Sequence, residues 1–241
     1  MYSIAFFWVG EDTSIPQRLV SSIRLIMGQS VEVIQLTDRE TPEIPAVTKV
    51  QRLDLSPLIM VARLQAYAQV KASGTFTFFC DADSIFITPL NLNFPIGDVF
   101  LTERTADHLI NDQYPEFYPE FSGKMIKEVM PILFGAIAVR GAQKEFFELL
   151  LDICLKLPKR FHRWYGDQYA VASAISSDNF QFGFLDPVKH LFIVRSEVTL
   201  AELAMLRSSN IQMITFKGKA SKTHIEGSLK NLRELIIQSA I

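Results

Sequence analysis

The chain has 241 residues, of which 49% are hydrophobic and 21% charged, and its formal net charge is −2 at pH 7. This composition is that of one sizeable globular domain, and the near-neutral charge without a basic block argues against nucleic acid as a partner. Cys80 and Cys154 lie in apolar stretches, which favours buried thiols in a reducing compartment. Because the start lacks a basic segment and no apolar stretch could span a bilayer, we expect a cytoplasmic protein, with peripheral contact to the inner face of a membrane left open.

The first ninety residues alternate between expected strands and helices. In chain order these are a strand at 4–9, a helix beginning at Thr13 or Ser14, strands at 31–36 and 46–53, a helix at 58–72 and a strand at 76–80. Continuous apolar runs are typical of strands covered on both faces, and strands that alternate with helices indicate a mainly parallel sheet. We therefore predict an α/β fold with a mainly parallel central sheet flanked by helices.

The remainder of the chain is less regular. We expect strands at 99–102, 132–139, 180–185, 191–194 and 211–216, a helix at 142–157, and a terminal helix that begins with a capping box of Thr223 and Glu226. Gly135, inside a buried strand, predicts the close approach of a backbone or ligand. No repeat or linker interrupts the chain, so we predict one domain over 1–241.

An aromatic loop precedes the second half of the sheet. Residues 111–119 contain Tyr114, Phe117 and Tyr118, with Pro115 and Pro119 among them. Long irregular connections often carry binding residues, so an acceptor-facing loop and an ordinary surface excursion are equally good interpretations.

Two carboxylates follow the strand at 76–80. Asp81 and Asp83, separated by Ala82, come at the end of this buried strand, where an unpartnered carboxylate is costly and implies a cation or a hydrogen-bond network. Mg²⁺ and Mn²⁺ are the usual partners of clustered carboxylates. Asp12 and Asp38 also follow expected strands, at the edge where parallel sheets bind ligands. Each alone is most often a turn or cap residue.

Three other interpretations of the pair are considered. The plainest is a strand-end turn without a metal. A phosphatase of the haloacid dehalogenase type normally has Thr or Val where Ile85 stands, and it carries the motif on its first strand. A nucleotidyltransferase normally has a glycine-rich basic loop after its first strand, where Gly10-Glu11-Asp12 is acidic.

Several short segments together resemble a known family. They are RLQAY at 63–67, FCDAD at 79–83, LFGAI at 133–137, GDQ at 166–168 and, more weakly, TFKG at 215–218. In this order they resemble the GT-A glycosyltransferases, and most closely the retaining galactosyl- and glucosyltransferases of glycosyltransferase family 8. The resemblance implies a Rossmann-like nucleotide-binding half at 1–90 and a sugar and acceptor half at 91–241.

The resemblance also implies roles for single residues. Asp81 and Asp83 would coordinate Mn²⁺ or Mg²⁺ against the diphosphate of a UDP-sugar, whose charge grows as it leaves. Asp167 would hold sugar hydroxyls, and Gln168 would lie under the anomeric carbon. The other implied donor-binding positions are Trp8, Val9, Asp12, Asp38, Arg63, Ala82, Lys217, Gly218 and Lys222. The ordinary alternatives are a helix N-cap for Asp167, and solvated cations for Arg63 and the lysines.

The sequence departs from the family at three places. Thr215 stands where the family has a His that completes the metal site, Leu133-Phe134 stands where it often has Asn, and Tyr169 replaces the last Asp of a D-Q-D pattern. The resemblance still implies a metal-dependent, retaining hexosyltransferase with a glycan or other hydroxyl acceptor, for example in surface polysaccharide or lipopolysaccharide synthesis. The missing His keeps open a catalytically silent sugar-nucleotide-binding protein.

Overall fold

The structure, a computed structural model, describes residues 2–91, 97–105, 107–110, 119–141, 143–176 and 179–239. The first half contains β1 (Tyr2–Phe7), α1 (Ser14–Met27), β2 (Glu32–Thr37), β3 (Lys49–Arg52), α2 (Ile59–Ala68), β4 (Phe76–Cys80), β5 (Ser84–Phe86) and β6 (Val99–Glu103). The second half contains α3 (Ile126–Val129), β7 (Ile132–Arg140), α4 (Gln143–Lys156), α5 (Gly166–Ala174), β8 (Phe182–Leu185), α6 (Pro187–His190), β9 (Phe192–Val194), α7 (Leu200–Ser208), β10 (Met213–Phe216), α8 (Lys219–Lys222) and α9 (Ile225–Ser239). The predicted loop with Tyr114, Phe117 and Tyr118 lies outside the described residues.

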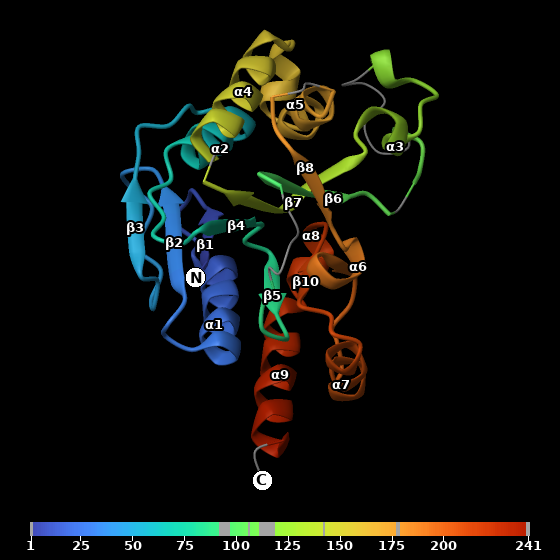
Figure 1. The fold of residues 1–241 in the computed structure, drawn as a ribbon. Helices are drawn as coiled ribbons and strands as arrows, with labels where there is room; N and C mark the ends of the chain where they lie inside the picture. The colour runs from blue at the N-terminus through green and yellow to red at the C-terminus, as the bar shows by residue number, and fades with distance from the viewer. Residues whose placement is uncertain are drawn as a thin grey trace.

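A seven-stranded sheet forms the centre of the molecule, in the order β3-β2-β1-β4-β7-β6-β8 (Figure 1). Strands β3, β2, β1 and β4 pair in parallel, β7 runs antiparallel to β4 and β6, and β6 pairs in parallel with β8. Within this sheet β7 alone runs against the other strands. The predicted α/β fold with a mainly parallel sheet is confirmed.

Helices cover both faces of this sheet, as the continuous apolar strands predicted. Along β1, Ala5 and Phe7 pack in the core beneath α2 and α4, while Ile4 and Phe6 pack in the core beneath α1. All four side chains are at most 8% exposed. This rigid frame holds the loops at the carboxyl ends of the parallel strands.

A second, smaller sheet begins directly after the Asp81-Ala82-Asp83 segment. It has the order β5-β10-β9, with β5 antiparallel and β9 parallel to β10, and its own core includes residues of α7 and α9. Phe216 N–H donates to the Asp83 carbonyl at 2.9 Å, which ties the end of β10 to the carboxylate segment. The two carboxylates therefore lie where the chain passes from one sheet to the other.

Two local predictions were wrong. The predicted helix at 58–72 ends at Ala68, because Gln51 of β3 accepts the backbone N–H of Lys71 at 3.0 Å and holds the following residues beside the sheet. No Thr223–Glu226 capping box forms, since the Thr223 hydroxyl donates to Ala220 and the Glu226 carboxylate pairs with Arg18 at 2.6 Å.

A capping box does form on α7, a helix that we did not predict. Thr199 Oγ1 accepts the backbone N–H of Glu202, and the Glu202 carboxylate accepts from the backbone N–H of Thr199. This reciprocal pattern satisfies two of the N–H groups that a helix start leaves without partners. It was present in the sequence and was overlooked.

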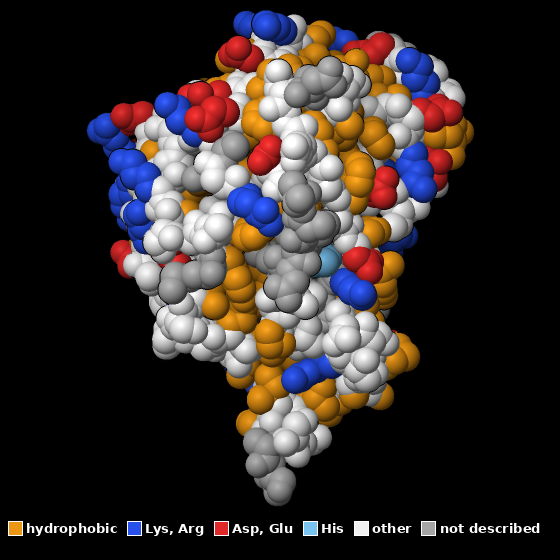
Figure 2. All heavy atoms as spheres, in the orientation of Figure 1, with side chains coloured by type: hydrophobic (Ala, Val, Ile, Leu, Met, Phe, Trp, Pro, Cys, Tyr) orange, Lys and Arg blue, Asp and Glu red, His pale blue; other side chains and the backbone are white. Residues whose placement is uncertain are grey.

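The surface mixes charges of both signs, and both cysteines are buried. On the face shown in Figure 2, basic and acidic side chains are interspersed, without a large patch of one sign. No helix within the described ranges has the length and apolar character required to cross a membrane. Cys80 and Cys154 are buried and free, as predicted.

Candidate functional site

Asp81 is held at the end of β4 by the neighbouring strand β7. Its backbone N–H donates to the Gly135 carbonyl at 3.1 Å. A Cβ atom on Gly135 would lie 2.9 Å from Asp81 Oδ2 and 3.2 Å from the Leu191 side chain. The predicted close approach at Gly135 is confirmed, because a larger residue there would displace the carboxylate.

Arg63 connects Asp81 to the start of α5. It is carried by α2, and its guanidinium pairs with Asp81 Oδ1 at 3.1 Å through Nη1 and with Asp167 Oδ2 through Nη2. The Asp167 side chain is fully buried and that of Arg63 is 16% exposed. The guanidinium also lies over the ring of Phe134, 4.7 Å from its centre. A buried carboxylate needs such a partner, so Arg63 is not the solvated cation considered above.

Two lysines from the segment after β10 complete the cluster. Lys217 Nζ contacts Asp81 Oδ2 and lies 3.5 Å from Asp83 Oδ1, and Lys222 Nζ lies 2.9 Å from Asp83 Oδ2. We call the six side chains that meet here the ion-pair cluster; they are Arg63, Asp81, Asp83, Asp167, Lys217 and Lys222. The cluster holds three carboxylates and three cations, so its formal charge is zero.

The cluster perturbs the ionisation of its members. Burial alone would raise the pKa of Asp81, but the charges of Lys217 and Arg63 outweigh it and lower that pKa from 3.8 to about 2. Burial would lower the pKa of Lys217, yet the carboxylates of Asp81 and Asp83 raise it above its usual 10.5. Both shifts favour the charged forms, so the ion pairs persist across the physiological pH range.

The residues present do not fit a divalent metal ion in this arrangement. Each of the four oxygens of Asp81 and Asp83 already contacts a cationic group of the protein. Thr215, at the place of the expected His, has its hydroxyl 3.4 Å from Asp83 Oδ1. Within the described ranges no group of three His, Cys, Asp or Glu side chains could hold a metal. Mg²⁺ and Mn²⁺ would have to displace Lys217 to reach both carboxylates.

Close packing defines the start of α5. A Cβ atom on Gly166 would lie 2.4 Å from the Phe161 carbonyl, so only glycine fits there. Tyr165, at the N-cap, has φ of 66°, an uncommon conformation for a residue other than glycine. Asp167 is consequently the second residue of the helix, and the alternative that made it the N-cap was wrong.

Gln168 projects into a polar contact with a residue that we did not anticipate. Its Oε1 accepts from Arg104 Nη2, and Arg104 Nε donates to the Met130 carbonyl at 2.9 Å. Burial lowers the pKa of Arg104. Arg104 directly follows β6, and no pattern in the sequence distinguished it from other cations after strands.

Two of the predicted donor-binding residues, Asp12 and Asp38, follow β1 and β2 and accept hydrogen bonds within their own loops. Asp12 accepts the backbone N–H of Ser14 at 2.9 Å at the start of α1, and Thr13, one of the two residues at which this helix was expected to begin, makes no side-chain cap. Asp38 accepts the N–H of Thr41 at 2.8 Å. Gly10 N–H donates to Thr41 Oγ1 at 2.8 Å and joins the two loops.

The other predicted donor contacts have structural roles of their own. Trp8 Nε1 donates to the Asp12 carbonyl at 3.0 Å, Val9 packs against the core beneath α2, and Ala82 is buried in the core beneath α1. Gly218 has φ of 93°, a backbone conformation that favours glycine. Nucleotide binding at these positions stays a prediction.

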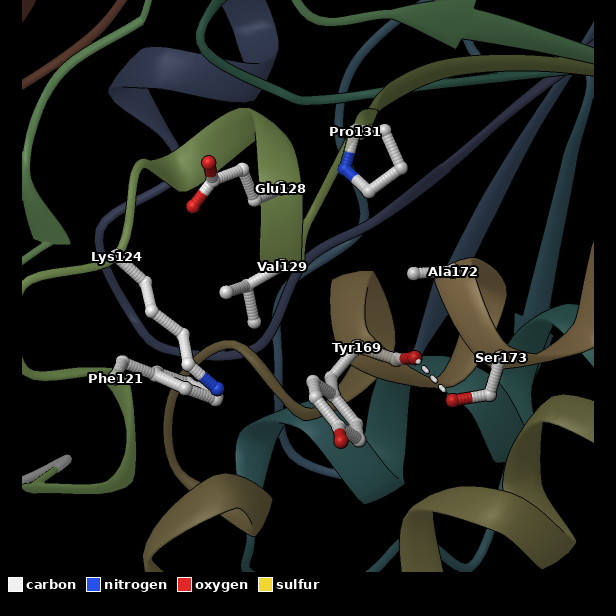
Figure 3. A pocket seen from close by; sticks show the side chains of 8 residues that line it. All are labelled: Phe121, Lys124, Glu128, Val129, Pro131, Tyr169, Ala172 and Ser173. Carbon is white, nitrogen blue, oxygen red and sulfur yellow. Dashed lines mark hydrogen bonds between the residues drawn. The ribbon is translucent and has the colours of Figure 1, made fainter.

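A pocket of about 300 Å³ lies between α5 and the segment around α3. It is lined by Phe121, Lys124, Glu128, Val129, Pro131, Tyr169, Ala172 and Ser173. Figure 3 shows side chains from the segment around α3 facing those of α5 across it. None of the cluster residues lines this pocket, although Tyr169 follows Asp167 and Gln168 in the same helix.

Comparisons with known proteins agree with this architecture. No protein-family model matches the sequence, and no curated protein matches it either. Solved structures do match. A glycosyltransferase involved in the glycosylation of the major capsid of PBCV-1 aligns with a TM-score of 0.56 and 10% identity, over 94% of this chain and 98% of its own.

Two further structures give similar alignments. The galactosyltransferase LgtC, in complex with donor and acceptor sugar analogs, aligns with a TM-score of 0.56 and 11% identity, over 97% of this chain and 95% of its own. The glycosyltransferase GlyE of Streptococcus pneumoniae aligns with a TM-score of 0.58 and 12% identity, over 99% of this chain and 64% of its own. The fold of the chain is therefore the GT-A fold of glycosyltransferases, as predicted.

Proposed function

We propose that the protein is a retaining glycosyltransferase that moves a hexose from a UDP-sugar to a glycan or another hydroxyl acceptor. The contact that carries this proposal is the Arg63 guanidinium, which joins Asp81, at the diphosphate end of the expected site, to Asp167, at its sugar end. These carboxylates come from segments 86 positions apart in the sequence (from 81 to 167). Their meeting through one buried cation supports a single site that spans the diphosphate and the sugar.

The residues of this site have distinct roles in the proposal. The lysines would attract the diphosphate, Asp167 would orient the sugar through Arg63 and α5, and Gln168 would lie beneath the anomeric carbon. Gln168 is neutral and its oxygen accepts from Arg104, so it would stabilise developing positive charge and not act as a covalent nucleophile. Metal dependence, which the resemblance implied, is not part of the proposal because the carboxylates are already paired.

The acceptor is proposed from the structural neighbours and the setting of the chain. Two of the matched proteins are named for the glycosylation of a capsid and for galactosyl transfer, so a surface glycan such as lipopolysaccharide or another polysaccharide is the acceptor class that we propose. The buried free thiols of Cys80 and Cys154 favour the reducing cytoplasm as the location.

A catalytically silent sugar-nucleotide-binding protein is the second candidate. The observation that favours it is the engagement of Gln168 by Arg104, which leaves less freedom to respond to a substrate. This binding protein would use the same donor site as the glycosyltransferase, but it would not turn the donor over.

Calorimetry and product analysis separate the candidates. We expect UDP to bind the full chain more tightly than CMP and GDP, and incubation with UDP-hexoses and glycan acceptors to release UDP. NMR of the product should show the same anomeric configuration as the donor. Absence of UDP binding refutes the proposal, inverted product refutes retention, and binding without UDP release favours the silent protein.

A further inference from the structure

Lys217 is placed between the two carboxylates by the strand that carries it. Strand β10 pairs with β5 so that Thr215 lies opposite Ser84, and Phe216 N–H bonds to the Asp83 carbonyl at 2.9 Å. The next residue, Lys217, consequently reaches Asp81 Oδ2 and Asp83 Oδ1 with one ammonium group. A cation that bridges both carboxylates occupies the position that a divalent ion would need.

The ion-pair cluster has no net formal charge, but its lysine and aspartate side chains differ in how far they are exposed. The side chains of Asp83 and Asp81 are 10% and 19% exposed, whereas those of Lys217 and Lys222 are each 35% exposed. The lysine side chains are thus more exposed than the carboxylates with which they pair. An approaching diphosphate would meet the lysines first, and the carboxylates would hold the lysines in place and keep them protonated.

We propose that Lys217 replaces the divalent cation in this protein, so that it binds the diphosphate of a sugar nucleotide without a metal. This inference rests on the proposed function and deepens it. During transfer the bond between the anomeric carbon and the β-phosphate oxygen breaks, and both electrons stay with the diphosphate. The acceptor oxygen forms the new bond to the anomeric carbon, and its proton passes to the diphosphate. Lys217 and Lys222 would stabilise the charge that the leaving group gains.

The test measures UDP binding to the metal-stripped full chain by calorimetry, in EDTA and in Mn²⁺. The wild type should bind UDP in EDTA, with an affinity that Mn²⁺ changes by less than about twofold. Lys217→Met should weaken binding in EDTA by about tenfold or more, as expected for the loss of a charge-assisted contact. Lys189→Met is the matched control, because Lys189 is 48% exposed and pairs with Asp186 away from the cluster; it should bind like the wild type.

A second measurement distinguishes cation replacement from a merely structural role. Lys217→Met frees an oxygen on each of the two carboxylates, so Mn²⁺ should now bind, visible as loss of the free Mn²⁺ signal in electron paramagnetic resonance. Mn²⁺ should also restore part of the lost UDP affinity. The wild type should leave the free Mn²⁺ signal unchanged. If Lys217→Met does not fold, Lys217→Gln carries the same measurements.

The remaining outcomes distinguish failure of the Lys217 role from failure of the proposed function. UDP binding by the wild type that requires Mn²⁺ overturns the role of Lys217 and leaves the proposed function intact. Unweakened binding by Lys217→Met in EDTA also overturns it. If UDP binds neither in EDTA nor in Mn²⁺, the proposed function fails, and the inference fails with it.

Discussion

Replacing Arg63 by Met tests whether a buried ion pair holds α5 against the sheet. Methionine keeps much of the apolar stem over Phe134 and removes the guanidinium that pairs with Asp81 and Asp167. Asp81 keeps Lys217 as a partner, but the fully buried Asp167 loses the cation that faces it. The energetic effect therefore comes mainly from an uncompensated charge at Asp167.

The size of the effect follows from the burial of this pair. Removing one partner of a buried ion pair costs about 3–5 kcal/mol, out of a total stability of about 5–15 kcal/mol. With a urea m-value of about 2–3 kcal/mol/M, the midpoint of unfolding should fall by about 1–2.5 M. Asn at position 167 would remove the stranded charge, so Arg63→Met/Asp167→Asn should be at least about 1 kcal/mol more stable than Arg63→Met alone.

Equilibrium urea unfolding, followed by circular dichroism, measures these differences. Arg39→Met is the control, because Arg39 pairs with Asp54 at 2.8 Å but both side chains are more than 70% exposed, at 74% and 78%. Such a surface pair contributes less than about 1 kcal/mol. The reasoning is refuted if Arg63→Met costs no more than Arg39→Met, or if the two changes at positions 63 and 167 are additive.

Three further predictions concern single residues of the site. The pKa of Asp81 is lowered from 3.8 to about 2, so the ionised Asp81 stabilises the fold above about pH 4, and this contribution should be lost as the pH falls to 2. The contribution to the free energy of unfolding is about 2 kcal/mol. Urea unfolding across that pH range should show this loss in the wild type and not in Asp81→Asn. Gly166→Ala would place a Cβ atom 2.4 Å from the Phe161 carbonyl and should cost about 1–3 kcal/mol in thermal unfolding, and an unchanged melting temperature would contradict the packing argument. Gln168→Ala should reduce kcat more than it raises KM for the donor, whereas the reverse pattern would make Gln168 a binding residue.

Much of the fold was predictable because the core of the large sheet is apolar on both faces. The apolar runs at 4–9 and 76–80 predicted buried strands. The structure has β1 at Tyr2–Phe7 and β4 at Phe76–Cys80. The boundaries that failed depend on distant contacts, as at Ala68, where Gln51 of another element ends the predicted helix. Local propensity carries no information on such a contact.

The carboxylates of the site could be predicted from the sequence, but the cations that pair with them could not. Asp81, Asp83 and Asp167 were selected from short motifs, and the Thr215 hydroxyl lies 3.4 Å from Asp83 Oδ1. The partners were missed, because Arg63 was assigned to the donor and not to Asp167, and Arg104 was not considered at all. Which cation faces which carboxylate is decided by packing between α2, α5 and β10, which short motifs do not encode.

The meaning of a carboxylate pair therefore depends on the charge that the rest of the chain delivers to it. Two aspartates alone leave a charge of −2 that a divalent ion neutralises well. Here Lys217 and Lys222 come from a segment more than 130 positions away, from 83 to 217, and supply the same charge without a metal. A lysine cannot coordinate as closely as Mn²⁺, but it carries its own proton and stays in place when no ligand is bound. Affinity for a diphosphate should therefore weaken steeply with salt, because the attraction comes from the charges of two partly exposed lysine side chains. An affinity that depends on Mn²⁺ concentration instead would show that the lysines merely occupy a metal site.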